Sequence, residues 1–181
     1  EIEAPTLLPS PDQAPTLSLF KTAAHNERKQ TFIAYLHTSP EYTMKKMLAA
    51  GYDKIFFLGK VFRDYESFGG THNPEFTMAE WYRPNVDFYT IMDDVEQLCA
   101  TALRAANKPM WSFTRWHMRD LWQQYVGVNL DDYLTVDTMR TLCAARGHQP
   151  AADEPYEDLF YRIFLNEIEP ELNKMSAVII H

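Results

Sequence analysis

Apolar and polar side chains alternate along two stretches near the middle of the chain, and this alternation predicts two neighbouring strands. The second stretch reads FTMAEWY over residues 76–82, and the first covers about 54–63 and is apolar until it ends at Arg63. A polar loop joins the two stretches, so we expect an antiparallel hairpin. Side chains in a strand point alternately to opposite faces, and the residues that share one face of the second strand are Phe76, Met78, Glu80 and Tyr82.

That shared face is unusual for a protein core, because it carries a carboxylate between a thioether and a phenol. A buried glutamate is rare unless it is paired, so the pattern favours a cleft in which Glu80 meets a cation. A guanidinium at the end of the first strand, Arg63, can grip a phosphate or a carboxylate through two hydrogen bonds. The hairpin therefore predicts a cleft for an elongated ligand with a flat ring and a distant ammonium group.

Helical and extended patterns predict further elements on both sides of the hairpin. Helices are expected at about 41–50, 87–102, 121–126, 135–146 and 159–169, and short strands at about 1–5, 32–36, 111–116 and 177–180. Four prolines over residues 5–15 indicate an extended segment, for which a linker is the plain interpretation. Together these elements predict an α+β fold, an antiparallel sheet flanked by helices, in a single domain over residues 1–181.

Two segments around the hairpin resemble motifs of a known family. HNPEFTMAEWYRP at 72–84, preceded by Arg63, resembles motif 2 of the class II aminoacyl-tRNA synthetases of the lysine, aspartate and asparagine branch. HTSPEYTMKKMLAAG at 37–51 resembles the amino-acid-binding segment of the same branch. Within it, WYRP, DFYTIMDDVEQL and LFYRIFLNEIEP are most similar to the lysyl-tRNA synthetase paralogues that modify elongation factor P. The resemblance implies a class II catalytic domain with a helical insertion at about 111–172, and an N-terminal segment that crosses the substrate cleft.

The resemblance also implies a role for each matching residue. Arg63 and Glu66 would be catalytic, and Arg63 would stabilise the charge that develops when the amino acid carboxylate attacks the α-phosphate. The amino acid would be bound by Ser39, Pro40, Glu41, Glu80 and Tyr82. The cofactors implied are ATP and Mg²⁺, and we expect no metal ligand in this chain. ATP would be bound by Arg63, Asp64, Tyr65, Glu66, His72, Asn73 and Phe76, the last by stacking on adenine.

The chain departs from the family pattern Arg-x-Glu, because it reads Arg63-Asp64-Tyr65-Glu66. Counting from Arg63 puts Tyr65 at the glutamate position, whereas counting back from His72 puts Glu66 there. We interpret the difference as a one-residue insertion with Glu66 as the functional carboxylate. Thr71 stands near a position that is usually basic in relatives, and nothing resembles the glycine-rich motif 3. The sequence therefore predicts a partial catalytic domain that is weak or inactive by itself.

Composition narrows the class of partner. The chain has 181 residues, a net charge of −8 and a pI near 5.2, which disfavours a nucleic-acid surface because phosphate binding relies on clustered lysine and arginine. Its two cysteines are far apart and indicate free thiols in a reducing compartment. No apolar run reaches the roughly 20 residues of a membrane span. We expect a cytoplasmic protein without a membrane partner.

Three functions remain open on these residues. The first is ATP-dependent activation of lysine or β-lysine as an aminoacyl-adenylate, followed by transfer to a lysine of elongation factor P. The second is a catalytic fragment of a lysyl-tRNA synthetase, with tRNA as the acceptor. The third is a non-catalytic paralogue that binds nucleotide or amino acid. A homodimer is expected for the full-length protein.

Overall fold

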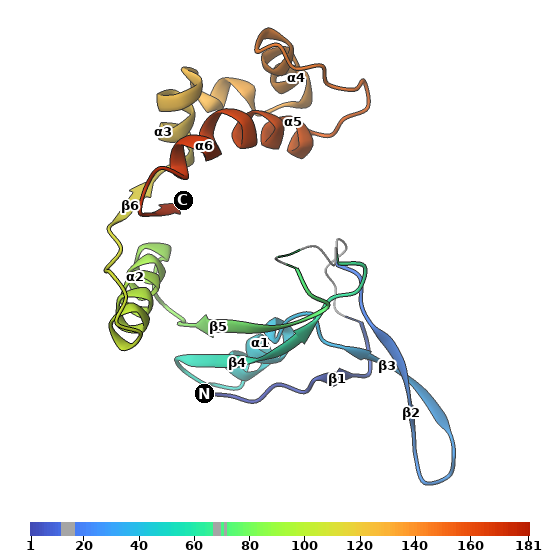
Figure 1. Cartoon of the computed structure of the whole chain (residues 1–181). Coiled ribbons are helices and arrows are strands. Elements are labelled where there is room, and N and C mark those ends of the chain that lie inside the picture. The colour runs from blue at the N-terminus through green and yellow to red at the C-terminus, as the bar shows by residue number, and fades with distance from the viewer. Residues whose placement is uncertain (12–16, 67–69, 71) are drawn as a thin grey trace. The chain divides into compact units, whose positions relative to one another are not determined.

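The computed structural model describes residues 1–11, 17–66, 70 and 72–181. Its contacts group into two compact units, residues 1–87 and residues 88–181 (Figure 1). Whether both units serve one catalytic domain stays a prediction. The hairpin and the predicted ligand-binding residues all belong to the first unit, so that unit is where the candidate site has to be sought.

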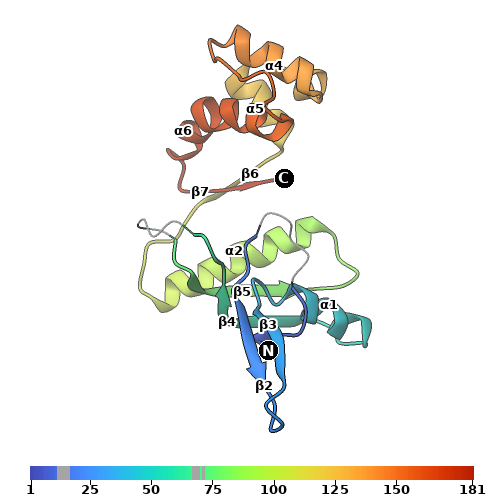
Figure 2. The same cartoon turned by 90° about the vertical axis from the view of Figure 1, so that its right-hand side faces the viewer.

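The first unit, as far as the structure describes it, contains two small sheets and one helix. Its elements are β1 (Leu7–Leu8), β2 (Lys21–His25), β3 (Thr31–Leu36), α1 (Glu41–Ala49), β4 (Ile55–Phe62) and β5 (Glu75–Tyr82). Strands β1, β3 and β2 form an antiparallel sheet in that order, and β4 pairs with β5. In both views the β2–β3 hairpin extends away from the other elements of its unit (Figures 1 and 2).

Two details of the first unit differ from the prediction. The strand expected at residues 1–5 is wrong: β1 begins after Pro5, and the first residues meet β4 through the amide of Ile2, which donates to the carbonyl of Phe56 at 2.8 Å. Strand β2 was not predicted. Its sequence KTAAH has no apolar alternation, and it is extended because it pairs with all five residues from Thr31 to Tyr35 of β3.

The register of β4 and β5 confirms the faces predicted from alternation. The cross-strand pairs on the face that carries Glu80 are Phe57–Glu80, Gly59–Met78 and Val61–Phe76. Helix α1 packs on this side, where Met44 is fully buried against Ile55, Phe57 and Val61. The opposite side of β4 is open, with Phe56 46% exposed and Leu58 58% exposed. The hairpin thus has one packed face, at whose end Arg63 stands, and one exposed apolar face.

The second unit is mainly helical in its described residues. Its elements are α2 (Phe88–Ala105), β6 (Phe113–Trp116), α3 (Met118–Leu121), the π-helical η1 (Trp122–Val126), the 3₁₀ turn η2 (Leu130–Tyr133), α4 (Val136–Ala145), α5 (Tyr156–Ile163), the π-helical η3 (Phe164–Ile168), α6 (Glu169–Leu172) and β7 (Ala177–Ile180). None of the described helices is both long and apolar enough to cross a lipid bilayer.

Two expectations for the second unit are corrected. Strand β7 pairs in parallel with β6 in a separate two-stranded sheet, so the expected entry of residues 177–180 into one antiparallel sheet is wrong. The last helix does not end at Pro170 but continues to Leu172, because a proline is tolerated in the first turn of α6. The α+β class is confirmed, but as several small sheets in place of one.

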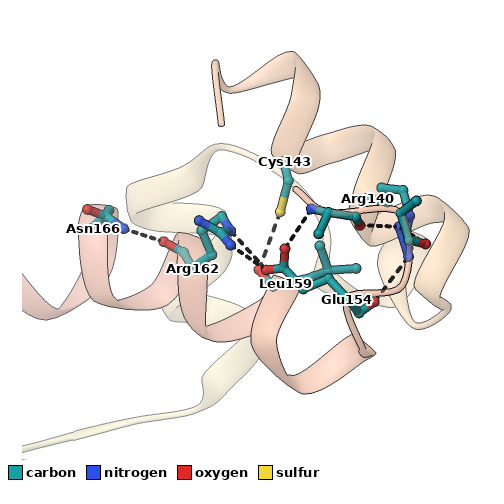
Figure 3. Close-up of polar contacts among 8 residues, drawn as sticks. Arg140, Cys143, Glu154, Leu159, Arg162 and Asn166 are labelled. Atoms are coloured by element: carbon teal, nitrogen blue, oxygen red, sulfur yellow. Dashed lines mark hydrogen bonds and ion pairs between the residues drawn. The ribbon is translucent and has the colours of Figure 1, made fainter. Parts of the chain in front are cut away.

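Two arginines, Arg140 and Arg162, hold the loop between α4 and α5, and we call this arrangement the clasp (Figure 3). Arg140 donates to the carbonyl oxygens of Ala151 at 3.0 Å and Glu154 at 3.0 Å, and Arg162 donates to the Glu154 carboxylate at 2.6 Å. The Glu154 side chain is only 8% exposed. The hydrogen bond from Arg162, together with one from the Ala151 amide, holds the pKa of Glu154 below its usual range. Beside this clasp, the free thiol of Cys143 donates to the carbonyl of Leu159 at 3.3 Å.

Candidate functional site

A cavity of about 940 Å³ opens on the side of the hairpin that carries Met78 and Glu80. It is within the size range of small-molecule sites. Four of the predicted ligand-binding residues line it together: Ser39, Glu41, Arg63 and Glu80. Its apolar wall comes from the N-terminal segment, through Pro5, Leu7, Leu8, Pro9 and Pro11. As far as it is described, this segment therefore packs along a cavity and is not a free linker, whereas its place across a substrate cleft stays a prediction.

Ser39 is placed at the start of α1, and it links the helix to the hairpin. Its hydroxyl oxygen accepts the amide of Glu41 at 3.0 Å, so its proton is free to be donated to Oε2 of Glu80 at 2.9 Å. Pro40 precedes the helix and is fully buried, outside the described lining of the cavity. Ser39 thus reaches the cavity and Pro40 does not, and a contact of Pro40 with the amino acid stays a prediction.

The carboxylate of Glu80 accepts a hydroxyl on each of its oxygens. Tyr82 donates to Oε1 at 2.9 Å, opposite the bond from Ser39 to Oε2. Burial raises the pKa of Tyr82, and the hydrogen bond to Glu80 and the charges of Glu80 and Glu41 raise it further. The phenol therefore stays a donor at neutral pH. The two donated bonds hold the carboxylate in one orientation at the cavity wall, where it can meet an ammonium group.

Arg63 lies at the far end of the same face. Its backbone amide donates to the carbonyl of Pro74 at 2.9 Å, and its guanidinium carbon lies 5.1 Å from the centre of the Phe76 ring. Its Nε atom is buried and has no hydrogen-bond partner in the described part of the chain. Leaving a buried donor unsatisfied costs about 1–3 kcal/mol. Arg63 also lines the cavity, and a guanidinium there suits an anionic ligand.

The loop after Arg63 begins with two residues that are held differently. The amide of Asp64 donates to the carbonyl of Ser18 at 2.9 Å, and the Asp64 carboxylate accepts the amide of Tyr65 at 2.9 Å. Tyr65 is 89% exposed and has a left-handed backbone, with φ of 57°. Glu66 is half-buried.

The structure does not bring the remaining residues that were predicted to contact the nucleotide into the cavity lining. His72 and Asn73 are exposed, and the described lining of the cavity includes neither of them, nor Tyr65 or Glu66. Thr71 lies outside the described residues. The roles of these loop residues stay predictions.

Sequence reasoning missed the wall of the cavity that α1 supplies. Tyr42, Thr43, Lys45 and Lys46 all line it. Lys45 pairs with Glu41 one turn earlier, and the Lys46 ammonium lies 4.3 Å from the centre of the Tyr42 ring. The i, i+4 spacing of Glu41 and Lys45 was a signal for their pairing, but no local pattern shows that this face of the helix meets the cavity.

A magnesium ion finds no ready set of ligands in the described residues. They contain no group of three or more His, Cys, Asp or Glu side chains that could hold a metal ion. The residues that line the cavity suit an anion and an ammonium group, and Mg²⁺ stays a prediction.

Comparison with known proteins shows which family the sequence of the chain matches. A family model described as tRNA synthetases class II (D, K and N) matches residues 1–159. Similar proteins include the elongation factor P–(R)-β-lysine ligases of Mannheimia succiniciproducens, 37% identical, Haemophilus influenzae, 34% identical, and Haemophilus ducreyi, 37% identical. Each match covers 100% of this chain and 54% of the relative. The chain thus spans about half the length of the curated relatives it matches.

Proposed function

The chain belongs to the class II tRNA synthetases of the D, K and N group, and from that premise we propose that the protein carrying it activates lysine or β-lysine with ATP and passes it to a lysine side chain of elongation factor P. The names of its relatives support the amino acid and the acceptor. The charges of the cavity support the same choice, because a basic amino acid joined to a phosphate needs acids and a guanidinium within one space.

In the proposed reaction, an oxygen of the amino acid carboxylate attacks the α-phosphorus of ATP and pyrophosphate leaves. Arg63 donates to the reacting phosphate and carboxylate, where negative charge develops. Glu80, oriented by Ser39 and Tyr82, receives an ammonium of the amino acid. The acceptor amine then attacks the carbonyl carbon of the adenylate, AMP leaves, and an amide forms. These residues position and stabilise the reactants, which is how enzymes promote phosphoryl-centre chemistry in general.

The observation that carries the proposal is that Arg63 and Glu80 line the same cavity. A guanidinium and a carboxylate in one space suit a ligand that carries both an anion and a cation.

Amino-acid-dependent exchange of pyrophosphate into ATP, measured on the full-length protein, tests the activation step. Lysine and β-lysine are expected to support exchange, and norleucine, which lacks the second ammonium, is not. Absence of exchange with both basic amino acids would contradict the proposal.

The acceptor needs a separate measurement. Radiolabelled lysine or β-lysine is expected to appear on elongation factor P and not on tRNA. Labelling of tRNA alone would favour a lysyl-tRNA synthetase. Binding of ATP and lysine without exchange would favour a non-catalytic paralogue. A homodimer and a cytoplasmic location stay predictions for the full-length protein.

A further inference from the structure

We infer that Lys45 is a specificity-determining residue of the cavity. Its ammonium group holds the Glu41 carboxylate in the place of an ammonium group of the amino acid, which has to displace it on binding. The inference rests on the proposed function, because it adds to the amino acid site a cation that competes with the substrate.

The two acids in the cavity wall have different kinds of partner. Glu80 accepts the hydroxyl groups of Ser39 and Tyr82, each at 2.9 Å, and both of these donors are uncharged. Glu41, in the first turn of α1, pairs instead with the ammonium group of Lys45. The negative charge of Glu80 is therefore not cancelled by these two donors, whereas that of Glu41 is already matched by a cation.

Both carboxylates act on the same part of the cavity. The Ser39 hydroxyl accepts the amide of Glu41 at 3.0 Å and donates to the Glu80 carboxylate. Besides burial and the hydrogen bond to Glu80, the charge of Glu41 raises the pKa of Tyr82. Two acids this close suit a ligand with two ammonium groups, and Lys45 brings an ammonium group of the protein to the same place.

The ion pair between Lys45 and Glu41 can be broken at low cost. The two side chains are 60% and 53% exposed, and they are four residues apart on one helix. Exposed pairs with this spacing contribute little to stability, because water screens both charges. The Lys45 side chain can therefore move into solvent when a ligand binds. The pair lowers the affinity for a second ammonium group but does not block it.

The neighbouring Lys46 provides a comparison within the same wall. Lys46 also lines the cavity, but its ammonium group lies 4.3 Å from the centre of the Tyr42 ring, which is a neutral partner. Removal of Lys46 takes a positive charge from the cavity without releasing a carboxylate, whereas removal of Lys45 does both. A difference between the two variants therefore measures the released carboxylate of Glu41.

The test measures binding of cadaverine to the full-length protein by isothermal titration calorimetry. Cadaverine has two ammonium groups and no carboxylate, so it probes the acids without the activation step. The variants are Lys45→Met, Lys46→Met, Glu41→Gln and the double variant of Lys45→Met with Glu41→Gln. Lys60→Met is the matched control, because Lys60 pairs with Glu75 at 3.4 Å, the two side chains are 57% and 54% exposed, and the described cavity lining includes neither.

Lys45→Met is expected to lower the Kd for cadaverine by about threefold, because this is within the range of exposed ion pairs. The KM for lysine in pyrophosphate exchange should fall by a similar factor, with kcat unchanged. Lys46→Met is expected to lower the Kd by less than about 1.5-fold, because salt screens a charge that releases no acid. Lys60→Met should leave the Kd unchanged. In the Glu41→Gln background, Lys45→Met should have no larger effect than Lys46→Met has alone.

Three results would overturn the inference. They are an unchanged or higher Kd of Lys45→Met, an equal gain in Lys46→Met, and absence of cadaverine binding to both the unmodified protein and Lys45→Met. If cadaverine binds but neither basic amino acid supports exchange, the proposed function fails. The Kd values of the Lys45 and Lys46 variants would then still support or overturn the competition at Glu41.

Discussion

Arginine side chains in the two units are used in opposite ways. In the second unit, Arg140 donates to the carbonyl oxygens of Ala151 and Glu154, and Arg162 donates to the Glu154 carboxylate (Figure 3). In the first unit, the buried Nε of Arg63 finds no acceptor among the residues described. The difference separates two functions of one residue type. Arg140 and Arg162 stabilise a loop through satisfied donors, whereas Arg63 is one of the residues that line a cavity.

The largest expected effect concerns stability in the unit that carries the clasp. Trp122 is fully buried, and its ring centre lies 5.0 Å from that of Phe160. Trp122→Ala is expected to lower the free energy of unfolding by about 3–5 kcal/mol, because it leaves a cavity in the core. Chemical denaturation measures the change. Trp111→Ala is the control, since Trp111 is 50% exposed and its removal should cost less than about 0.5 kcal/mol.

Arg63→Ala tests the other side of the comparison. Removing a donor that stabilises developing charge is expected to slow lysine-dependent exchange by about 100- to 1,000-fold. Stability should change by less than about 1 kcal/mol, because in the described part of the chain no acceptor loses a hydrogen bond from Nε. Arg28→Ala, on the exposed turn between β2 and β3, is the control and should leave exchange unchanged. A large loss of stability in Arg63→Ala would make Arg63 a structural residue like Arg140.

The hydroxyls that hold Glu80 should show coupled effects on amino acid binding. Ser39→Ala and Tyr82→Phe each remove one hydrogen bond to the carboxylate and are expected to raise the KM for lysine by about fivefold. Because both act through the same carboxylate, the double variant should not show the product of the two changes. A fully multiplicative double variant would mean that they act independently of Glu80.

Replacement of Glu154 is expected to have a smaller effect on stability, and only at low pH. The pKa of this carboxyl is held below its usual range by Arg162, so the ionised form stabilises the folded state. That contribution is present above the carboxyl's unfolded pKa of about 4.3 and is lost as the pH falls through the lower folded value. Glu154→Gln should therefore flatten the dependence of stability on pH below about 4.3. If the stability of Glu154→Gln depended on pH as that of the unmodified protein does, the ionised Glu154 carboxylate would not stabilise the folded state.

The hairpin could be predicted from the sequence because alternation is strong in both strands and because a register with one carboxylate on the inner face is distinctive. Glu80 and Arg63 were placed on one side for that reason, and the cavity that both residues line confirms it. The cavity could not be derived in the same way. Its walls come from residues 5–11, from α1 and from β5, which are distant in the chain, and only the family resemblance indicated that the first of these lines the cleft.

The sequence did not predict elements whose conformation depends on pairing with another strand or on a small shift in the hydrogen-bond pattern. Strand β2 is extended through its pairing with β3 and has no periodicity of its own. The π-helical turns at η1 and η3 differ from an α-helix by a shift of one residue in the hydrogen bonds, which composition does not show. The turn at Tyr65 belongs to the same class, because a tyrosine carries no signal for a left-handed backbone.

The open side of β4 has a practical consequence for handling the protein. Phe56 and Leu58 present two large apolar side chains to solvent on adjacent positions of that face. Neighbouring exposed apolar side chains favour association with other apolar surfaces. The chain prepared as it stands should therefore be retained on phenyl chromatography resin. A lysine in place of Leu58 should shorten that retention without touching the cavity, since Leu58 points to the other side of the strand.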